Sequence, residues 1–148
     1  MRTKSFISTV VATSAFVSLF FSSEHMLAME KYKWKNRPLL VFATTGDDAQ
    51  YQRQRQIIGR RLAGFIERDM IIVYVLADSV TAELGPPPGQ SAETLRFKYG
   101  IRKSEFRTIL VGKDGGAKLS SGSPVSEQRI FGLIDGMPMR REEMRRRK

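Results

Sequence analysis

The sequence predicts an α/β fold in which a mixed central sheet of about four strands carries helices on both faces. Two continuous apolar runs flank a stretch with helical spacing, a hairpin signal follows them, and a last helix has clear start and stop residues. With 148 residues, of which 41% are hydrophobic, the chain has room for one domain around one core.

The first predicted strand comprises residues 39–44, an apolar run bounded by Pro38 and Gly46, as expected for a strand buried on both faces. Residues 47–68 then show helical spacing, and Thr45 or Asp47 is expected to cap this helix. Its apolar face comprises Tyr51, Ile58, Leu62 and Phe65, and its opposite face comprises Arg53, Arg60, Arg61 and Arg68.

Residues 70–76 form the second predicted buried strand, and the sequence GPPPG at 85–89 predicts a loop. A short helix is expected to start at Ser91 and to end near Tyr99 and Gly100.

Residues 106–111 and 117–121 are predicted to pair as a β-hairpin around the turn sequence KDGG. The last helix is expected to have Ser123 as its N-cap and Pro124 in its first turn, and to stop at Gly136 and Pro138. Its predicted core stripe comprises Ile130, Leu133, Ile134 and Met137.

The order strand, helix, strand, helix, hairpin, helix is that of a thioredoxin-like domain. Three blocks also resemble a thioredoxin-like family of unknown function: WKNRPLLVFA (34–43), LVGKDGG (110–116) and LIDGMPMRR (133–141). The family is found in exported bacterial proteins and in vertebrate extracellular sushi-repeat and coiled-coil-containing matrix proteins. The resemblance covers residues 32–145. It implies a fold and an extracytoplasmic setting, and no reaction.

The N-terminal residues 1–28 have the layout of a signal peptide, since Arg2 and Lys4 precede an uncharged apolar run at 6–21. That run is shorter than the about 20 residues of a comfortable membrane span, so we expect cleavage after Ser22, Ser23 or Ala28 and a periplasmic or secreted protein. An uncleaved membrane anchor is the alternative. The remaining chain divides into a domain at 29–139 and a basic tail at 140–148.

The chain contains no cysteine, and its one histidine, His25, lies within the predicted leader. Thiol–disulfide exchange, thiolate metal sites and imidazole-assisted nucleophilic catalysis are therefore excluded from the predicted mature domain. We expect no cofactor, no metal and no catalytic residue, and a binding or adaptor protein rather than an enzyme.

The place of the thioredoxin redox pair is taken by residues 46–49, which include two aspartates, and Arg107 stands where the cis-proline is found. We expect a trans peptide bond there. The predicted binding site at this corner comprises Asp47, Asp48, Arg55, Arg107 and Thr108. The competing interpretation is that these residues only cap a helix and form a surface ion pair. The alternative function is a cofactor-free enzyme that uses Asp47, Asp48 and Arg107, which requires burial to raise the pKa of one aspartate.

The basic surface is the second candidate site, since loss of Arg2, Lys4 and Glu24 with the leader reduces the net charge only from +10 to +9. An arginine-rich surface fits an anionic partner, whether lipid headgroups, glycans or an acidic protein. A solvated basic terminus is the competing interpretation. The predicted anion-binding residues are Arg53, Arg60, Arg140, Arg141, Arg145, Arg146 and Arg147.

Trp34 lies among lysines just before the first strand. Such a pattern can stack on nucleic acid bases, but export disfavours nucleic acid as a partner. We expect the ring of Trp34 to pack under the edge of the sheet.

Overall fold

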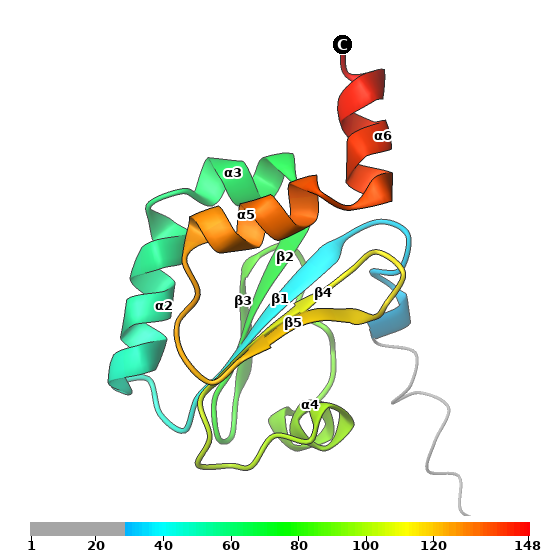
Figure 1. The fold of residues 1–148 in the computed structure, drawn as a ribbon. Coiled ribbons are helices and arrows are strands. Elements are labelled where there is room, and N and C mark those ends of the chain that lie inside the picture. The colour runs from blue at the N-terminus through cyan, green and yellow to red at the C-terminus, as the bar shows by residue number, and fades with distance from the viewer. Residues whose placement is uncertain (1–28) are drawn as a thin grey trace, which may run out of the picture.

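The computed structural model describes residues 29–148 and contains one five-stranded sheet in the order β3-β2-β1-β4-β5 (Figure 1). The strands β1 and β2 are parallel, and the other neighbouring pairs are antiparallel. The strands are β1 (Arg37–Phe42), β2 (Met70–Val75), β3 (Val80–Leu84), β4 (Arg107–Val111) and β5 (Ala117–Ser121). The helices are α2 (Ala49–Gly59), α3 (Leu62–Glu67), α4 (Ala92–Tyr99), α5 (Glu127–Asp135) and α6 (Pro138–Arg146).

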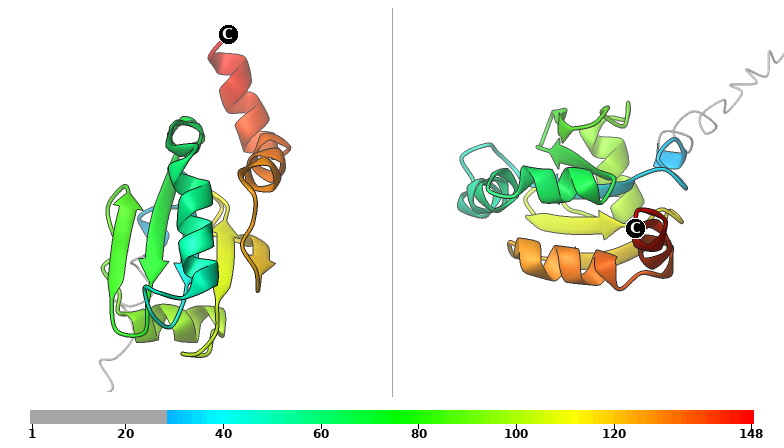
Figure 2. Two further views of the ribbon diagram at one scale, coloured as in Figure 1. Left: turned by 90° about the vertical axis from the view of Figure 1, so that its left-hand side faces the viewer. Right: turned by 90° about the horizontal axis from the view of Figure 1, so that it is seen from above.

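The helices cover both faces of the sheet, because alternate side chains of β1 enter two separate cores. Leu39 and Val41 belong to the core beneath α2, α3 and α5, whereas Leu40 and Phe42 belong to the core beneath α4. Figure 2 shows α4 on one side of the sheet and α2, α3 and α5 on the other, whereas α6 extends beyond the end of the sheet (Figure 1). The predicted thioredoxin-like α/β fold is confirmed, with one strand more than expected.

The additional strand is β3, which pairs with β2 at one edge of the sheet. Residues 80–84 were not predicted as a strand because they are few and lead directly into the proline-rich loop. The predicted first helix is in fact two helices, α2 and α3, which meet at Arg60 and Arg61. The N-cap of α2 is Asp48 rather than Thr45 or Asp47.

The end of the chain also differs from the prediction. The N-cap of α5 is Ser126 and not Ser123, so the helix begins at Glu127. The reason is that Val125 is buried, its carbonyl accepts a hydrogen bond from Gln54 Nε2, and its N–H donates to Gln54 Oε1. The helix α5 ends at Asp135 with Gly136 as its C-cap, as predicted. Pro138 then begins a further helix, α6, in the first-turn position where its missing N–H costs nothing.

The predicted tail at 140–148 is therefore mostly helix, and ion pairs fix it to the sheet. Arg37 of β1 and Arg140 of α6 are each 1% exposed; Arg37 contacts Glu143 of α6 at 3.0 Å, and Arg140 contacts Glu67 at the end of α3 at 2.7 Å. Lys113 Nζ bridges Glu143 and Asp69 at 2.7 Å and 2.9 Å. Glu143 and Arg140 of α6 therefore hold this helix against the sheet and α3.

One aromatic residue, Trp34, lies differently from the prediction. Trp34 is 63% exposed and does not pack under the sheet edge, because its left-handed backbone (φ 63°) turns the side chain outward. Phe97 of α4 is 90% exposed. The predicted leader lies outside the described residues. No helix within residues 29–148 combines the length and the apolar character needed to cross a membrane.

Candidate functional site

Unpaired arginines gather along α2 and at its junction with α3. Arg53, Arg60 and Arg61 are exposed, and none of them forms an ion pair within residues 29–148. We call these three residues the α2 arginine surface. Their positive charge is available to a partner, because no internal carboxylate neutralises it.

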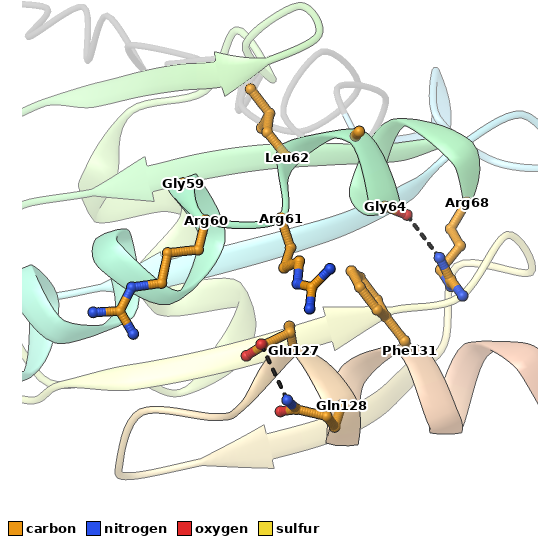
Figure 3. Close-up of a pocket in the computed structure, with 10 residues that line it drawn as sticks. Gly59, Arg60, Arg61, Leu62, Gly64, Arg68, Glu127, Gln128 and Phe131 are labelled. Carbon is orange, nitrogen blue, oxygen red and sulfur yellow. Dashed lines mark hydrogen bonds between the residues drawn. The ribbon is translucent and has the colours of Figure 1, made fainter.

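The break between the two helices orients Arg60 and Arg61. Arg60 is the C-cap of α2 in helical conformation, whereas Arg61 precedes α3 with φ −136° and ψ 29°. The chain changes direction between them, and the two side chains leave on different sides. Figure 3 shows Arg61 pointing toward Glu127 and Phe131 of α5, and Arg60 extending away from them.

A cavity of about 640 Å³ lies between this junction and the start of α5 (Figure 3). Phe131 comes so close to Gly64 that a β-carbon there would lie 2.7 Å from the ring. The cavity is lined by Gly59, Arg60, Arg61, Leu62, Ala63, Gly64, Arg68, Glu127, Gln128 and Phe131.

Arg68 is the fixed cation of the cavity. Its Nε and Nη2 donate to Asp135 at 3.0 Å and 2.6 Å, its Nη1 donates to the carbonyl of Gly64, and its guanidinium lies 4.1 Å from the ring centroid of Phe131. Its hydrogen bonds lower the pKa of Asp135, although burial alone would raise it. Arg68 therefore has little capacity left for a ligand, and recognition would fall to Arg60 and Arg61.

The cavity also contains one carboxylate. Glu127 accepts a hydrogen bond from Gln128 Nε2 at 3.1 Å and forms no ion pair with a described residue. Guanidinium groups present planar, forked donors that match carboxylate, sulfate and phosphate oxygens. The arrangement is suited to binding an anionic group at an open surface.

The predicted corner site has a different character. Asp48 Oδ1 accepts the N–H of Tyr51 at 3.0 Å and caps α2, and Asp47 accepts the hydroxyl of Thr45, which lowers the pKa of Asp47. Arg107 lies beside Phe42 in the sheet register and pairs with Glu105. The structure brings these residues to one end of the sheet without joining the aspartates to Arg107.

The other two residues of the predicted corner site, Thr108 and Arg55, also contact side chains of the domain. Thr108 is fully buried and donates to Gln54 Oε1 at 3.3 Å. Arg55 lies over two tyrosine rings, 5.8 Å from the centroid of Tyr51 and 5.3 Å from that of Tyr74. Every peptide bond within residues 29–148 is trans, including the bond before Thr108. The raised aspartate pKa that the enzyme hypothesis requires is not found at Asp47.

The arginines predicted in the tail divide into two groups. Arg140 is buried among Glu67, Asp135 and Glu143 and is not available to a partner. Arg145 and Arg146 share Glu142 but remain about three quarters exposed. Arg147 contacts Asp69 at 3.8 Å, and Arg141 is exposed and without an ion pair within the described chain.

Sequence reasoning missed the α5 side of the cavity. Gln128 and Phe131 are more than 60 residues from Arg61 in the sequence, and no local pattern connects them. It also missed Arg96, a buried guanidinium that donates to the carbonyls of Ala43, Val75 and Arg102 and holds the ends of two strands. The sequence indicates the burial of Arg96 only through its place next to Leu95 on the buried side of α4.

Solved structures resemble this fold at low sequence identity. Plasmodium yoelii Prx1a superposes with a TM-score of 0.58 at 15% identity, over 77% of this chain and 80% of that one. Plasmodium yoelii thioredoxin peroxidase I gives a TM-score of 0.57 at 14% identity, over 76% and 79%. At such identities the likeness establishes the thioredoxin-like fold alone.

Relatives identified by sequence are much longer proteins. The chain is 28% identical over 133 residues to coiled-coil domain-containing protein 80 of Danio rerio, covering 78% of this chain and 15% of that protein. It is 29% identical over 122 residues to the sushi repeat-containing protein SRPX of Rattus norvegicus, covering 78% of this chain and 26% of that protein. A family match over residues 28–143 agrees with these similarities, and the chain belongs to the family described as a domain of unknown function, DUF4174.

Proposed function

We propose that this protein is a non-redox, thioredoxin-like binding domain that engages an anionic partner through the α2 arginine surface. The observation that carries the proposal is the exposure of Arg53, Arg60 and Arg61 without internal carboxylate partners, beside a cavity. Exposed guanidinium groups attract and orient anions without performing chemistry on them.

A setting outside the cytoplasm is part of the same proposal. It rests on the basic start and apolar run of residues 1–28 and on the family's resemblance to sushi-repeat proteins. The absence of cysteine is compatible with an oxidising compartment, because the domain holds its end helix with ion pairs and not with disulfides.

The test is a binding titration with dextran sulfate, a soluble polyanion, at low and at physiological salt. The triple variant Arg53→Gln, Arg60→Gln, Arg61→Gln is expected to lose about 30-fold in affinity, at about 0.7 kcal/mol for each exposed contact. Binding of the unaltered chain is expected to weaken as the salt concentration rises.

The control removes the same charge from elsewhere on the surface. Lys98, Arg102 and Lys103 lie on α4 and in the loop after it, and all three are exposed. Their joint replacement by glutamine should change affinity no more than a few-fold. Equal losses in the two triple variants would show that net charge alone attracts the polyanion, and would contradict a specific site on α2.

A further inference from the structure

Trp34 is a bulky residue in a backbone conformation that disfavours side chains. Its φ is 63°, and its side chain is 63% exposed although it is the only tryptophan in the chain. Positive φ is a genuine outlier for a large residue. Strained backbone of this kind persists where surrounding structure holds it, commonly at functional sites.

The surrounding contacts hold this turn firmly. The N–H of Trp34 donates to the carbonyl of Lys113 at 2.6 Å, and the N–H groups of Lys35 and Asn36 donate to the carbonyl of Tyr32 at 3.0 Å and 2.8 Å. Tyr32 is itself buried, and its hydroxyl donates to the carbonyl of Pro86 at 2.6 Å. The indole ring is thus presented to solvent from a fixed support.

The charges around the ring are mainly positive. Lys31, Lys33 and Lys35 alternate with the aromatic residues, against the single carboxylate of Glu30, which pairs with Lys33 at 3.2 Å. Lys35 is exposed and has no ion pair within the described chain. Tryptophan and lysine together are the residues that settle at the headgroup level of a bilayer.

The position in the chain points to the same partner. The apolar run of the leader ends at Phe21, eight residues before Met29, so an extended connection spans at most about 28 Å. Whenever that run occupies a bilayer, during export or as a retained anchor, the end of the domain that carries Trp34 is within reach of the membrane surface.

We propose that the turn at residues 31–35 docks the domain on an anionic lipid bilayer, with the ring of Trp34 in the interface and the lysines among the headgroups. This surface is separate from the α2 arginine surface. Either proposal can therefore fail without the other.

The test uses Trp34 itself as the probe, because the chain has one tryptophan. The full chain is mixed with vesicles of phosphatidylglycerol and phosphatidylcholine, or of phosphatidylcholine alone, some containing brominated lipid. With anionic vesicles the Trp34 emission should shift to the blue and be quenched by brominated lipid. With neutral vesicles the Trp34 emission should remain that of an indole in water, even if the apolar run of the leader attaches the chain to the vesicle.

Three variants sharpen the result. Replacing Lys33 and Lys35 by glutamine should raise the lipid concentration needed for the half-maximal shift about 30-fold, which is roughly a fivefold factor per lysine. Replacing Lys98 and Lys103 instead should change it little. Trp34→Phe combined with Phe97→Trp moves the probe to the exposed position on α4, where no shift is expected.

Several outcomes would overturn the proposal. The proposal is wrong if the Trp34 emission does not shift on anionic vesicles, or if it shifts as much on neutral vesicles. It is also wrong if a tryptophan at position 97 shifts as much on anionic vesicles as Trp34 does. A shift with dextran sulfate and none with vesicles would assign the turn to a soluble polyanion instead.

Discussion

Replacing Glu143 by glutamine removes the carboxylate that joins α6 to the sheet. Arg37 donates to its two oxygens at 3.2 Å and 3.0 Å, and Lys113 donates at 2.7 Å. Burial alone would raise the pKa of Glu143, but these hydrogen bonds outweigh it and lower the pKa from 4.5 to about 2.

The size of the effect follows from this shift. A drop of that extent corresponds to about 3 kcal/mol at about 1.4 kcal/mol per pKa unit. Since the Glu143 side chain is 20% exposed, solvent reduces the contribution to about 2 kcal/mol. The variant also leaves Arg37 buried without its counter-charge, so we expect a loss of about 3 kcal/mol in the free energy of unfolding.

The assay is urea denaturation at pH 7 and at pH 3, with Glu142→Gln as the matched control. Glu142 is 43% exposed, and its ion pairs within residues 29–148 are with Arg145 and Arg146 of its own helix, so its replacement should cost less than about 0.5 kcal/mol. Because the pKa of Glu143 is lower in the folded state, its contribution is complete above pH 4.5 and is lost as the pH falls toward 2. The gap between wild type and Glu143→Gln should therefore narrow at pH 3. Equal stability of the two variants at pH 7 would refute the role of Glu143.

Two further stability predictions each have a matched control variant. Gly64→Ala should destabilise the protein by about 1–3 kcal/mol in thermal unfolding, because the new β-carbon meets Phe131 at 2.7 Å. Gly59→Ala has open space around the new β-carbon and should be neutral or stabilising by up to about 1 kcal/mol. A loss of stability in both variants would contradict the packing of Phe131 against Gly64. Asp48→Ala should cost about 1 kcal/mol by removing the N-cap of α2, whereas Asp48→Asn, which retains a side-chain acceptor, should be nearly neutral in the same measurement. An equal cost for both Asp48 variants would show that its charge matters more than its capping bond.

The central elements of the fold were predictable because their signals are local. The continuous apolar runs of β1 and β2 and the KDGG turn between β4 and β5 each identify an element without reference to the rest of the chain. Ser91 was correctly predicted to begin α4, where its hydroxyl accepts the N–H of Thr94.

The start of α5 and the helical state of residues 138–146 were not predictable, because long-range contacts decide them. The helix α6 is rich in arginine and glutamate and was predicted as a basic tail, yet Arg37 and Lys113 fix it through Glu143. The start of α5 is delayed by the hydrogen bonds between Gln54 and Val125, which are 71 residues apart. Periodicity and capping rules contain no information on such pairs.

The candidate site was predictable only in part. Helical spacing grouped the arginines of α2, and the structure leaves Arg53 and Arg60 exposed as that spacing implied. The cavity beside Arg61 depends on Phe131 and Gly64 meeting across two helices, which no local pattern reveals. For Trp34, the positive φ that turns the ring outward depends on the hydrogen bond from its N–H to the carbonyl of Lys113, which lies in the turn between β4 and β5.

The measurement that tests the proposed function most directly is the salt dependence of dextran sulfate affinity, compared between the α2 triple variant and the control triple on the α4 side. If Arg53, Arg60 and Arg61 contact the polyanion, the α2 variant binds about 30-fold more weakly at low salt and its affinity depends less steeply on salt. The control should keep both the affinity and the salt dependence of the unaltered chain. A control variant that loses as much affinity as the α2 variant, or an α2 variant that loses none, would contradict the proposed binding function.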